Sequence, residues 1–369
     1  MAGVGFLSGY DVLVCAQCGL GFAGGIPTQA EFNAYYHHLS KYDHESREGQ
    51  QSAADLQRLR DTAATLIPFV PSTSARILDI GCSTGFLLSL VRGAGFQKVR
   101  GLDPSPQSAK SAWELFQLSV DTGSIVENSI PDGSVDFAIL IAVLEHVEGL
   151  EAAVQRLKRM LAPGGRIFAE VPDASRFAGR PDAPFQEFSV EHINFFSKVS
   201  LANLFREHGF RPILTGEADR QQDENMTGPT AYGIFEAGSA ASSLDRDNIT
   251  EPGLRRYIEE SSAGDSRVRE AIKERVSGRP IIVWGTGTHT QRLLAAGAFA
   301  TVTVRAFVDS NPKYQGHDLS GIPIVAPQSL HSRSEPILIS TRGFQREIYN
   351  QIRDHLGLKN ELILLYELD

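Results

Sequence analysis

The chain has 369 residues, of which 42% are hydrophobic and 21% are charged, and its formal net charge is −9 at pH 7. This length predicts two or three globular domains, and the acidic balance argues against a general nucleic-acid binder, which needs a basic surface. The sequence has no run of about eighteen apolar residues and does not begin like a signal peptide, so we expect a cytoplasmic protein without a membrane segment.

Residues 1–50 form a polar arm rich in glycine, tyrosine and histidine, and we do not expect this arm to build a core of its own. It carries Cys15 and Cys18, two of the three cysteines of the chain. An odd and low cysteine count predicts no disulfide framework and fits a reducing compartment.

From residue 51 the apolar pattern alternates between helical and strand spacing. Leu56, Leu59, Ala63 and Leu66 recur at helical intervals, which predicts a helix that ends at Pro68. Predicted strands at 76–80, 99–102, 135–141 and 166–171 then alternate with predicted helices at 86–92, 108–118 and 150–161. Because this alternation is typical of a parallel sheet covered on both faces, we assign residues 51–215 to one α/β domain.

The pattern breaks between residues 217 and 246, where polar and small residues dominate. We expect residues 216–276 to be a connecting or substrate-facing segment that ends in a helix over 252–276. The alternation then restarts, with strands at 280–284, 302–308 and 336–340 and helices at 291–296 and 345–356. Residues 277–369 are therefore predicted to form a second, smaller Rossmann-like α/β domain.

The segment from Ile77 to Phe86 reads Ile-Leu-Asp-Ile-Gly-Cys-Ser-Thr-Gly-Phe, a strand followed by a glycine turn and a helix start. A pyrophosphate-binding turn has the spacing G-x-G-x-x-G with no acid ahead of it, whereas here Asp79 precedes Gly81 and Gly85. A carboxylate at that place repels a pyrophosphate and suits a cation. We therefore prefer S-adenosylmethionine, with its amino and sulfonium groups, to NAD. The alternative is a tight turn without a ligand.

Asp103 strengthens this interpretation. It follows the strand at 99–102, one βα unit after the glycine turn. An acid at that strand end can accept hydrogen bonds from both ribose hydroxyls of a nucleoside.

Residues 55–215 resemble the class I S-adenosylmethionine-dependent methyltransferases. The matching motifs are Leu78–Gly85, Gly101–Pro104, Ile130–Asp136, Leu144–His146 and Leu161–Gly165. The resemblance implies a seven-stranded, mostly parallel sheet, with S-adenosylmethionine as the methyl donor and S-adenosylhomocysteine as the product. It also implies that Glu127 and Asn128 contact adenine. The cofactor-binding set is then Asp79, Gly81, Cys82, Ser83, Thr84, Gly85, Asp103, Pro104, Glu127, Asn128 and Ala142.

A second site is indicated by Glu191 and His192, which follow the last strand of this domain. Histidine can accept a proton near neutral pH, and an adjacent carboxylate can orient it. A capping or core histidine is the alternative. However, His146 follows another strand at the same sheet edge, so we expect His146 and His192 to converge on one cleft.

The segment Ser189–Ser197 resembles the Glu-His-x-x-Phe/Tyr-Phe-Ser block of sugar C-methyltransferases that act on deoxysugar nucleotides. Further segments that resemble this family are Cys15–Phe22, Tyr35–Tyr42, Val283–Gly287, Phe307–Pro312 and Gly321–Ile324. The resemblance thus spans nearly the whole chain and implies a nucleotide-linked sugar as acceptor.

In that family the histidine of the Glu-His pair removes a proton next to a ketone. The resemblance therefore implies that His192 is the base, that Glu191 supports it, and that His146 and Tyr42 contact the acceptor. The family commonly has a tyrosine where this chain has Ser189. An O-methyltransferase that deprotonates a hydroxyl of a sugar or another small metabolite is therefore the alternative.

Relatives in that family hold a structural zinc ion with two Cys-x-x-Cys pairs. Only Cys15 and Cys18 are present in this arm, since Cys82 belongs to the cofactor turn. A tetrahedral zinc site needs four ligands, so we expect no metal unless other residues supply the missing ones.

The predicted C-terminal domain has its own glycine turn, and its amide groups could hold phosphate. We expect this domain to bind the acceptor's nucleotide through Gly285, Thr286, Gly287, Thr288 and Arg342. An NAD site with Asp309 on the ribose, or a docked domain without a ligand, are the alternatives. For the whole chain the rival is a non-catalytic cofactor-binding scaffold, and the sequence does not predict the oligomeric state.

Overall fold

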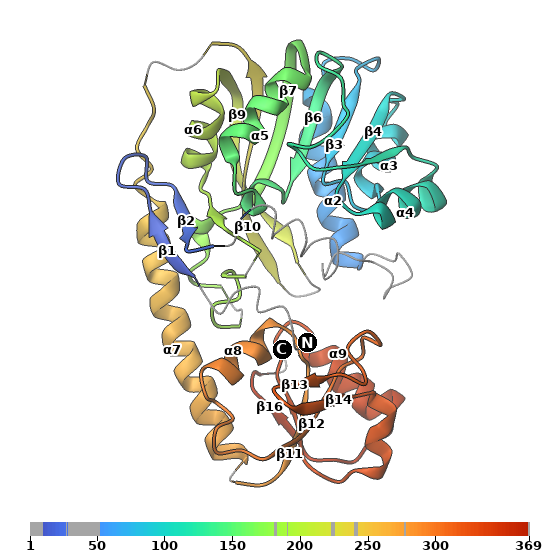
Figure 1. Cartoon of the computed structure of the whole chain (residues 1–369), viewed down its shortest axis with the longest axis vertical. Coiled ribbons are helices and arrows are strands. Elements are labelled where there is room, and N and C mark those ends of the chain that lie inside the picture. The colour runs from blue at the N-terminus through green and yellow to red at the C-terminus, as the bar shows by residue number, and fades with distance from the viewer. Residues whose placement is uncertain are drawn as a thin grey trace. The chain divides into compact units, whose positions relative to one another are not determined.

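The computed structural model describes residues 10–26, 28, 52–180, 183–189, 191–222, 226–239, 243–276 and 278–367 (Figure 1). Within these residues the chain divides into two compact units. The larger unit comprises residues up to 178 together with 191–254, and the smaller unit comprises 179–189 and 255–367. No helix in the described part of the chain is both long and apolar enough to cross a membrane.

A seven-stranded sheet with the order β5-β4-β3-β6-β7-β10-β9 forms the centre of the larger unit. Its strands are β3 (Ile77–Ile80), β4 (Val99–Asp103), β5 (Val120–Thr122), β6 (Val135–Ile141), β7 (Leu161–Pro172), β9 (Phe210–Gln221) and β10 (Thr227–Ala237). The first five are parallel, whereas β10 is antiparallel to both β7 and β9. The predicted seven-stranded, mostly parallel sheet is confirmed.

Helices cover both faces of this sheet, as the uninterrupted apolar strands require. Alternate side chains of β3 enter different cores, with Ile77 on one face and Leu78 and Ile80 on the other. The helices α2 (Ala53–Leu66), α3 (Phe86–Gly93) and α4 (Pro106–Phe116) pack on the Ile77 face. The helices α5 (Leu150–Met160) and α6 (Lys198–Glu207) pack on the opposite face. The predicted alternation of strands and helices is therefore observed.

The prediction of an irregular segment over 217–246 is wrong. Strands β9 and β10 form a long antiparallel hairpin that completes the sheet, so the boundary expected at residue 215 falls inside β9. The pattern was hard to recognise because β9 is an edge strand with Pro212, Gly216 and several charged residues. The expected helix after it is present as α7 (Thr250–Val276).

A buried ion pair holds the charged hairpin onto the sheet. Arg220 of β9 donates to the Glu170 carboxylate of β7 from Nε at 3.0 Å and from Nη2 at 2.7 Å. The two side chains are only 7% and 2% exposed. The Thr62 hydroxyl also donates to Glu170, at 3.3 Å. The carboxylate is thus paired and hydrogen-bonded, which a buried charge needs.

The described part of the N-terminal arm adds a small sheet to the larger unit. Strands β1 (Asp11–Val14), β2 (Gly21–Gly24) and β8 (Asn194–Phe195) pair antiparallel in that order. Cys15 and Cys18 lie in the turn between β1 and β2, where the Gly19 N–H donates to the Cys15 carbonyl at 2.9 Å. The arm therefore folds against the larger unit, in line with the expectation that it has no core of its own.

The smaller unit is a six-stranded sheet with the order β13-β14-β12-β11-β15-β16. Its strands are β11 (Ile281–Trp284), β12 (Val304–Val308), β13 (Asp318–Leu319), β14 (Ile322–Val325), β15 (Ile337–Ile339) and β16 (Leu362–Leu364). Every pair except β13–β14 is parallel. The C-terminal part of α7 (Val268–Val276) and the helix α8 (Thr288–Ala295) pack on one face, and α9 (Gln345–Asn350) packs on the other. The predicted second Rossmann-like unit is confirmed.

Replacement of Arg220 by alanine is expected to lower the free energy of unfolding by about 3–5 kcal/mol, because it leaves the buried Glu170 carboxylate without its cation. The matched control is Arg211→Ala on the same hairpin, since Arg211 is 66% exposed where it pairs with Glu236. That change should cost at most about 1 kcal/mol. Urea denaturation measures both, and equal losses would contradict this account of the ion pair.

Candidate cofactor and acceptor site

The turn between β3 and α3 has a backbone that depends on glycine. Gly81 and Gly85 have φ angles of +74° and +79°. A Cβ on Gly81 would lie 2.7 Å from a methyl group of Val143, so a side chain there would also clash. Ser83 has a φ of +50°, a conformation that non-glycine residues rarely adopt outside functional turns. The predicted glycine turn therefore has the close packing and positive φ expected of a ligand-binding loop.

Asp103 holds this turn from the neighbouring strand. One carboxylate oxygen accepts the Ser83 N–H at 2.9 Å, and the other accepts the Ser105 N–H at 2.9 Å. The structure thus brings Asp103 to the glycine turn, as the order of the motifs predicted.

Asp79 is buried at the end of β3, with 3% of its surface exposed. Burial raises its pKa well above the usual value of 3.8, and the negative charge of Asp103 raises it further. A positive ligand next to Asp79 would favour the ionised form and lower this pKa. Binding of a cation and ionisation of Asp79 are therefore coupled.

The remaining predicted cofactor residues differ in what they offer a ligand. Cys82 is buried, and its pKa is raised by burial and by the charges of Asp79 and Asp103, so its thiol stays neutral. Thr84 is buried, whereas Pro104 is exposed. Ala142 follows β6 with a φ of +53° and is exposed. The carboxyl ends of β3, β4 and β6 thus form one edge with two strained backbone positions.

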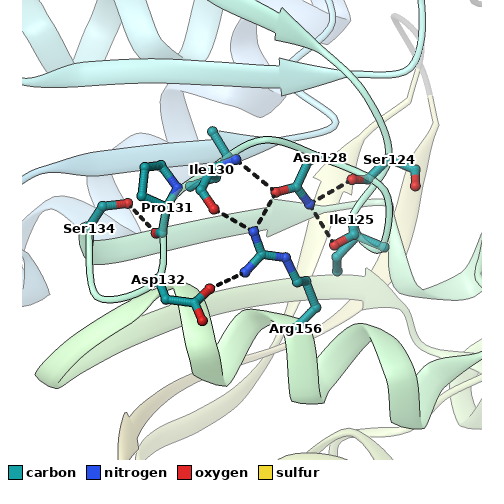
Figure 2. Close-up of polar contacts among 8 residues, drawn as sticks. All are labelled: Ser124, Ile125, Asn128, Ile130, Pro131, Asp132, Ser134 and Arg156. Atoms are coloured by element: carbon teal, nitrogen blue, oxygen red, sulfur yellow. Dashed lines mark hydrogen bonds and ion pairs between the residues drawn. The ribbon is translucent and has the colours of Figure 1, made fainter.

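The loop before β6 carries Glu127 and Asn128, and Figure 2 shows how it is held. The Asn128 side-chain nitrogen donates to the carbonyls of Ser124 and Ile125, each at 3.0 Å, and its oxygen accepts the Ile130 N–H at 3.1 Å. Arg156 of α5 donates to the same oxygen at 3.0 Å. The loop and Arg156 together therefore use all four hydrogen-bonding positions of the amide. We assign Asn128 to holding the loop, which leaves Glu127 as the candidate for adenine.

Arg156 makes further hydrogen bonds that hold this loop. Its guanidinium also donates to the Ile130 carbonyl and, at 2.7 Å, to the Asp132 carboxylate (Figure 2). The Arg156 side chain is 11% exposed. The sequence pattern gave no indication of this residue, because its role depends on a loop 24–32 positions earlier in the chain.

The second predicted site is assembled by hydrogen bonds between two segments. A short 3-10 helix, Leu144–His146, follows β6, and residues 191–195 lie against it. The Ile193 N–H donates to the Glu145 carbonyl at 2.8 Å. The Asn194 side chain donates to the carbonyls of Leu144 and Val147 at 2.9 and 2.7 Å. These bonds fix the Glu191-His192 pair against the Glu145-His146 pair.

The two histidines converge as predicted. Their ring centroids lie 4.9 Å apart with the planes at 70°. The Glu191 backbone carbonyl lies 2.8 Å from His146 Nδ1, so Glu191 contributes its main chain to this arrangement. Glu145, to which sequence reasoning assigned no role, is 1% exposed, and its carboxylate lies 3.9 Å from His146 Nε2. Its position next to His146 in the sequence was the available signal. Tyr42 lies outside the described residues.

Cys15 and Cys18 differ in their surroundings. Hydrogen bonds from the Cys18 and Gln17 backbone lower the pKa of Cys15, whereas burial raises that of Cys18. Among the described residues, the one group of three or more potential ligand side chains within reach of a common ion is elsewhere.

In the smaller unit the predicted residues lie around the start of α8. Gly285 has a φ of +108°, and the N–H of buried Thr286 donates to Asp309 at 3.2 Å. The Thr286 hydroxyl and the Asn311 N–H also donate to Asp309, so this carboxylate is used to hold the loop.

Gly287 caps α8, and Thr288 is its exposed first residue. The Arg342 guanidinium lies 4.9 Å from the centre of the Tyr366 ring, whose hydroxyl lies 2.7 Å from His289 Nε2. Burial and the charge of Arg292 lower the pKa of His289 to about 4, so this histidine is neutral. Arg342 is thus brought to the helix start, where an anion is favoured.

Comparison with known proteins identifies the chemistry. Residues 48–215 match the family described as Methyltransferase domain, and residues 278–364 match one described as C2185-like, N-terminal. The C-methyltransferase NovU of Streptomyces niveus is 24% identical over 344 residues, which is 86% of this chain and 76% of that protein. The O-methyltransferase resE of Aspergillus sclerotiorum is 27% identical over 188 residues, 48% of this chain and 69% of its own length.

A solved 1,6-didemethyltoxoflavin-N1-methyltransferase of Burkholderia thailandensis, with bound S-adenosylhomocysteine, aligns with 62% of this chain and 98% of its own. The identity is 18% and the TM-score 0.47. Residues 48–215 thus form a methyltransferase domain, and the family match and the relatives support an S-adenosylmethionine-dependent methyltransferase activity.

Replacement of Asp79 by asparagine is expected to weaken binding of S-adenosylhomocysteine at least about tenfold, since a buried charge-assisted contact to its amino group is lost. The same change should raise the stability of the cofactor-free protein near neutral pH. Asp79 has a raised pKa in the folded state, so as pH rises the unfolded chain ionises first and folding loses free energy. Calorimetric titration and thermal denaturation measure the two effects. Unchanged affinity would refute the assignment.

Proposed function

We propose that this S-adenosylmethionine-dependent methyltransferase transfers its methyl group to a nucleotide-linked sugar, with His192 accepting the proton that the acceptor loses. The observation that carries this proposal is the convergence of His146 and His192 after β6, at the sheet edge that also bears the glycine turn. Val143, one residue before the Leu144–His146 helix, packs on Gly81 of that turn. A base and a methyl donor would therefore share one end of the sheet.

The tautomer of His146 supports an acceptor-binding role for this edge. Because His146 Nδ1 faces the Glu191 carbonyl, it carries the proton, and the lone pair is on Nε2. The His192 ring lies edge to face with the His146 ring and is half-buried. Two imidazoles in this arrangement can orient an acceptor hydroxyl or carbonyl and receive its proton.

The chemistry would be an in-line displacement at the methyl carbon of the sulfonium. The nucleophilic carbon or oxygen attacks the methyl group, and the electron pair of the breaking bond stays on sulfur, which leaves neutral S-adenosylhomocysteine. Most of the acceleration would come from holding nucleophile and methyl group close and aligned. Removal of the acceptor proton by His192, supported by Glu191, would complete the reaction.

Methylation at oxygen is the second candidate. Ser189 stands where sugar C-methyltransferases commonly have a tyrosine, and the relatives include both a C-methyltransferase and O-methyltransferases. A hydroxyl of a sugar or another small metabolite could be deprotonated by the same histidine.

For the smaller unit we propose binding of the acceptor's nucleoside diphosphate. Support comes from the amide groups at the start of α8, the exposed Thr288 and the guanidinium of Arg342 above Tyr366. These groups suit a diphosphate, which favours helix N-termini and arginine. In this proposal residues 51–237 are the cofactor domain, and the smaller unit selects the nucleotide.

Replacement of His192 by alanine should lower kcat about 10²–10⁴-fold on a keto- or hydroxy-sugar nucleotide, since general-base catalysis is lost. Affinity for S-adenosylhomocysteine should not change. His208→Ala is the matched control, because His208 Nδ1 also lies 2.8 Å from a backbone carbonyl, that of Leu204 in α6. Steady-state turnover and calorimetry measure both quantities. Full turnover in the His192 variant would exclude the base role, and an inert wild type with every such acceptor would favour the non-catalytic scaffold.

Replacement of Arg342 by alanine should weaken binding of a nucleoside diphosphate about tenfold, because one charge-assisted contact to phosphate is lost. Arg346→Ala provides the control, since Arg346 is exposed on α9 of the same unit. Calorimetric titration with UDP and with dTDP tests both variants. No binding of either nucleotide by the wild type would rule out this part of the proposal.

A further inference from the structure

Glu145, His146 and His192 form a compact set of donor groups that the reaction proposed above does not fully use. One ligand atom from each side chain can be chosen so that all three lie within 4.8 Å of one another. Glu145 is 1% exposed and the His146 side chain is 13% exposed. Two imidazoles and one carboxylate from two separate segments thus meet at one point of the sheet edge.

We propose that these three side chains bind a divalent transition-metal ion such as Zn²⁺. The combination of two histidines and one carboxylate is a ligand set used by zinc and by non-haem iron, with positions left open for another ligand. Mg²⁺ prefers ligand sets made of oxygen alone. The imidazoles therefore select against it.

The protonation state of His146 suits a metal ligand. Its Nδ1–H donates to the Glu191 carbonyl at 2.8 Å, which places the lone pair on Nε2, the atom 3.9 Å from the Glu145 carboxylate. Metal-binding histidines almost always donate their other ring N–H to a carbonyl or carboxylate. The Glu191 main chain would serve as this outer contact, and it also fixes the plane of the ring.

The separations fit an ion after a small adjustment. Bonds of about 2.0–2.2 Å in a tetrahedral zinc site place neighbouring ligand atoms about 3.4 Å apart. The 3.9 Å between Glu145 and His146 and the 4.8 Å limit for the whole set exceed this value modestly. Side-chain rotations alone could bring the three ligand atoms within bonding distance of one ion, because the hydrogen bonds of Asn194 and Ile193 already hold the two segments together.

The ion would deepen the proposed function, on which this step rests, by binding an oxygen of the acceptor at an open position. A divalent ion lowers the pKa of a bound hydroxyl. The hydroxyl would lose its proton to water and become an alkoxide nucleophile. In the metal-bound enzyme His192 is a ligand, and in the metal-free enzyme it remains the base. The site would therefore favour hydroxyl acceptors and O-methylation.

The test is calorimetric titration of the full chain with Zn²⁺, followed by Mg²⁺. Cys15 and Cys18 are the competing zinc ligands, so the titration uses the Cys15→Ser/Cys18→Ser background. One equivalent of Zn²⁺ should bind, and Mg²⁺ should bind far more weakly. His192→Ala and Glu145→Gln should each weaken Zn²⁺ binding at least about tenfold, by comparison with the losses seen for outer-shell changes.

The controls are His208→Ala, just after α6, and Glu151→Gln, on the exposed side of α5, and both should leave Zn²⁺ affinity unchanged. Retained S-adenosylhomocysteine binding shows that each variant is folded. Absence of Zn²⁺ binding, or binding that His192→Ala and Glu145→Gln leave intact, overturns the metal site without touching the proposed function. If the protein binds zinc but turns over no sugar nucleotide, the proposed function is refuted and the metal site is supported.

Discussion

The carboxylate of Asp103 links the cofactor turn to the sheet, and the arrangement of the larger unit depends on that link. It accepts the Ser83 N–H while Gly81 and Gly85 supply the positive φ angles of the same turn. The bonds join neighbouring strands β3 and β4, whose carboxyl ends lie at one edge because the strands are parallel. Asp79 lies on β3 near that edge. Burial raises its pKa, and a positive ligand would favour its ionised form.

The proposed acceptor site lies at the same edge, but hydrogen bonds between two distant segments position its residues. His192 lies outside the seven-stranded sheet, two residues before β8. Asn194 and Ile193 bond to the main chain of the Leu144–His146 helix, and His146 returns a bond to the Glu191 carbonyl. These hydrogen bonds join segments 45–50 positions apart and are buried or partly buried, so the two histidines are held without support from a bound ligand. A rigid pair of imidazoles suits either proton transfer or metal binding.

Both units hold their first glycine turn in the same way, although the residues around the two turns differ in charge. In each, an aspartate at the end of the second strand accepts the N–H of a residue in the first glycine turn, Asp103 from Ser83 and Asp309 from Thr286. The larger unit has a buried acid two residues before its first turn glycine, Asp79, whereas Val283 stands at the matching position in β11. The cation-binding feature is thus confined to the larger unit, which is consistent with an anionic ligand for the smaller one.

The sequence alone determined the alternation of strands and helices, the glycine turn with Asp79 and Asp103, and the position of His146 after its strand, because each follows from local periodicity or from the rule that parallel strands end together. Only the tertiary structure decided the rest. The polar hairpin β9–β10 joins the sheet by pairing β10 with β7, and the buried ion pair of Arg220 with Glu170, 50 positions apart, supports it. Asn128 serves its loop because Arg156 reaches it from α5. Glu145 joins the histidines through folding of distant segments. Such pairings depend on contacts between residues far apart in the chain, which no local pattern records.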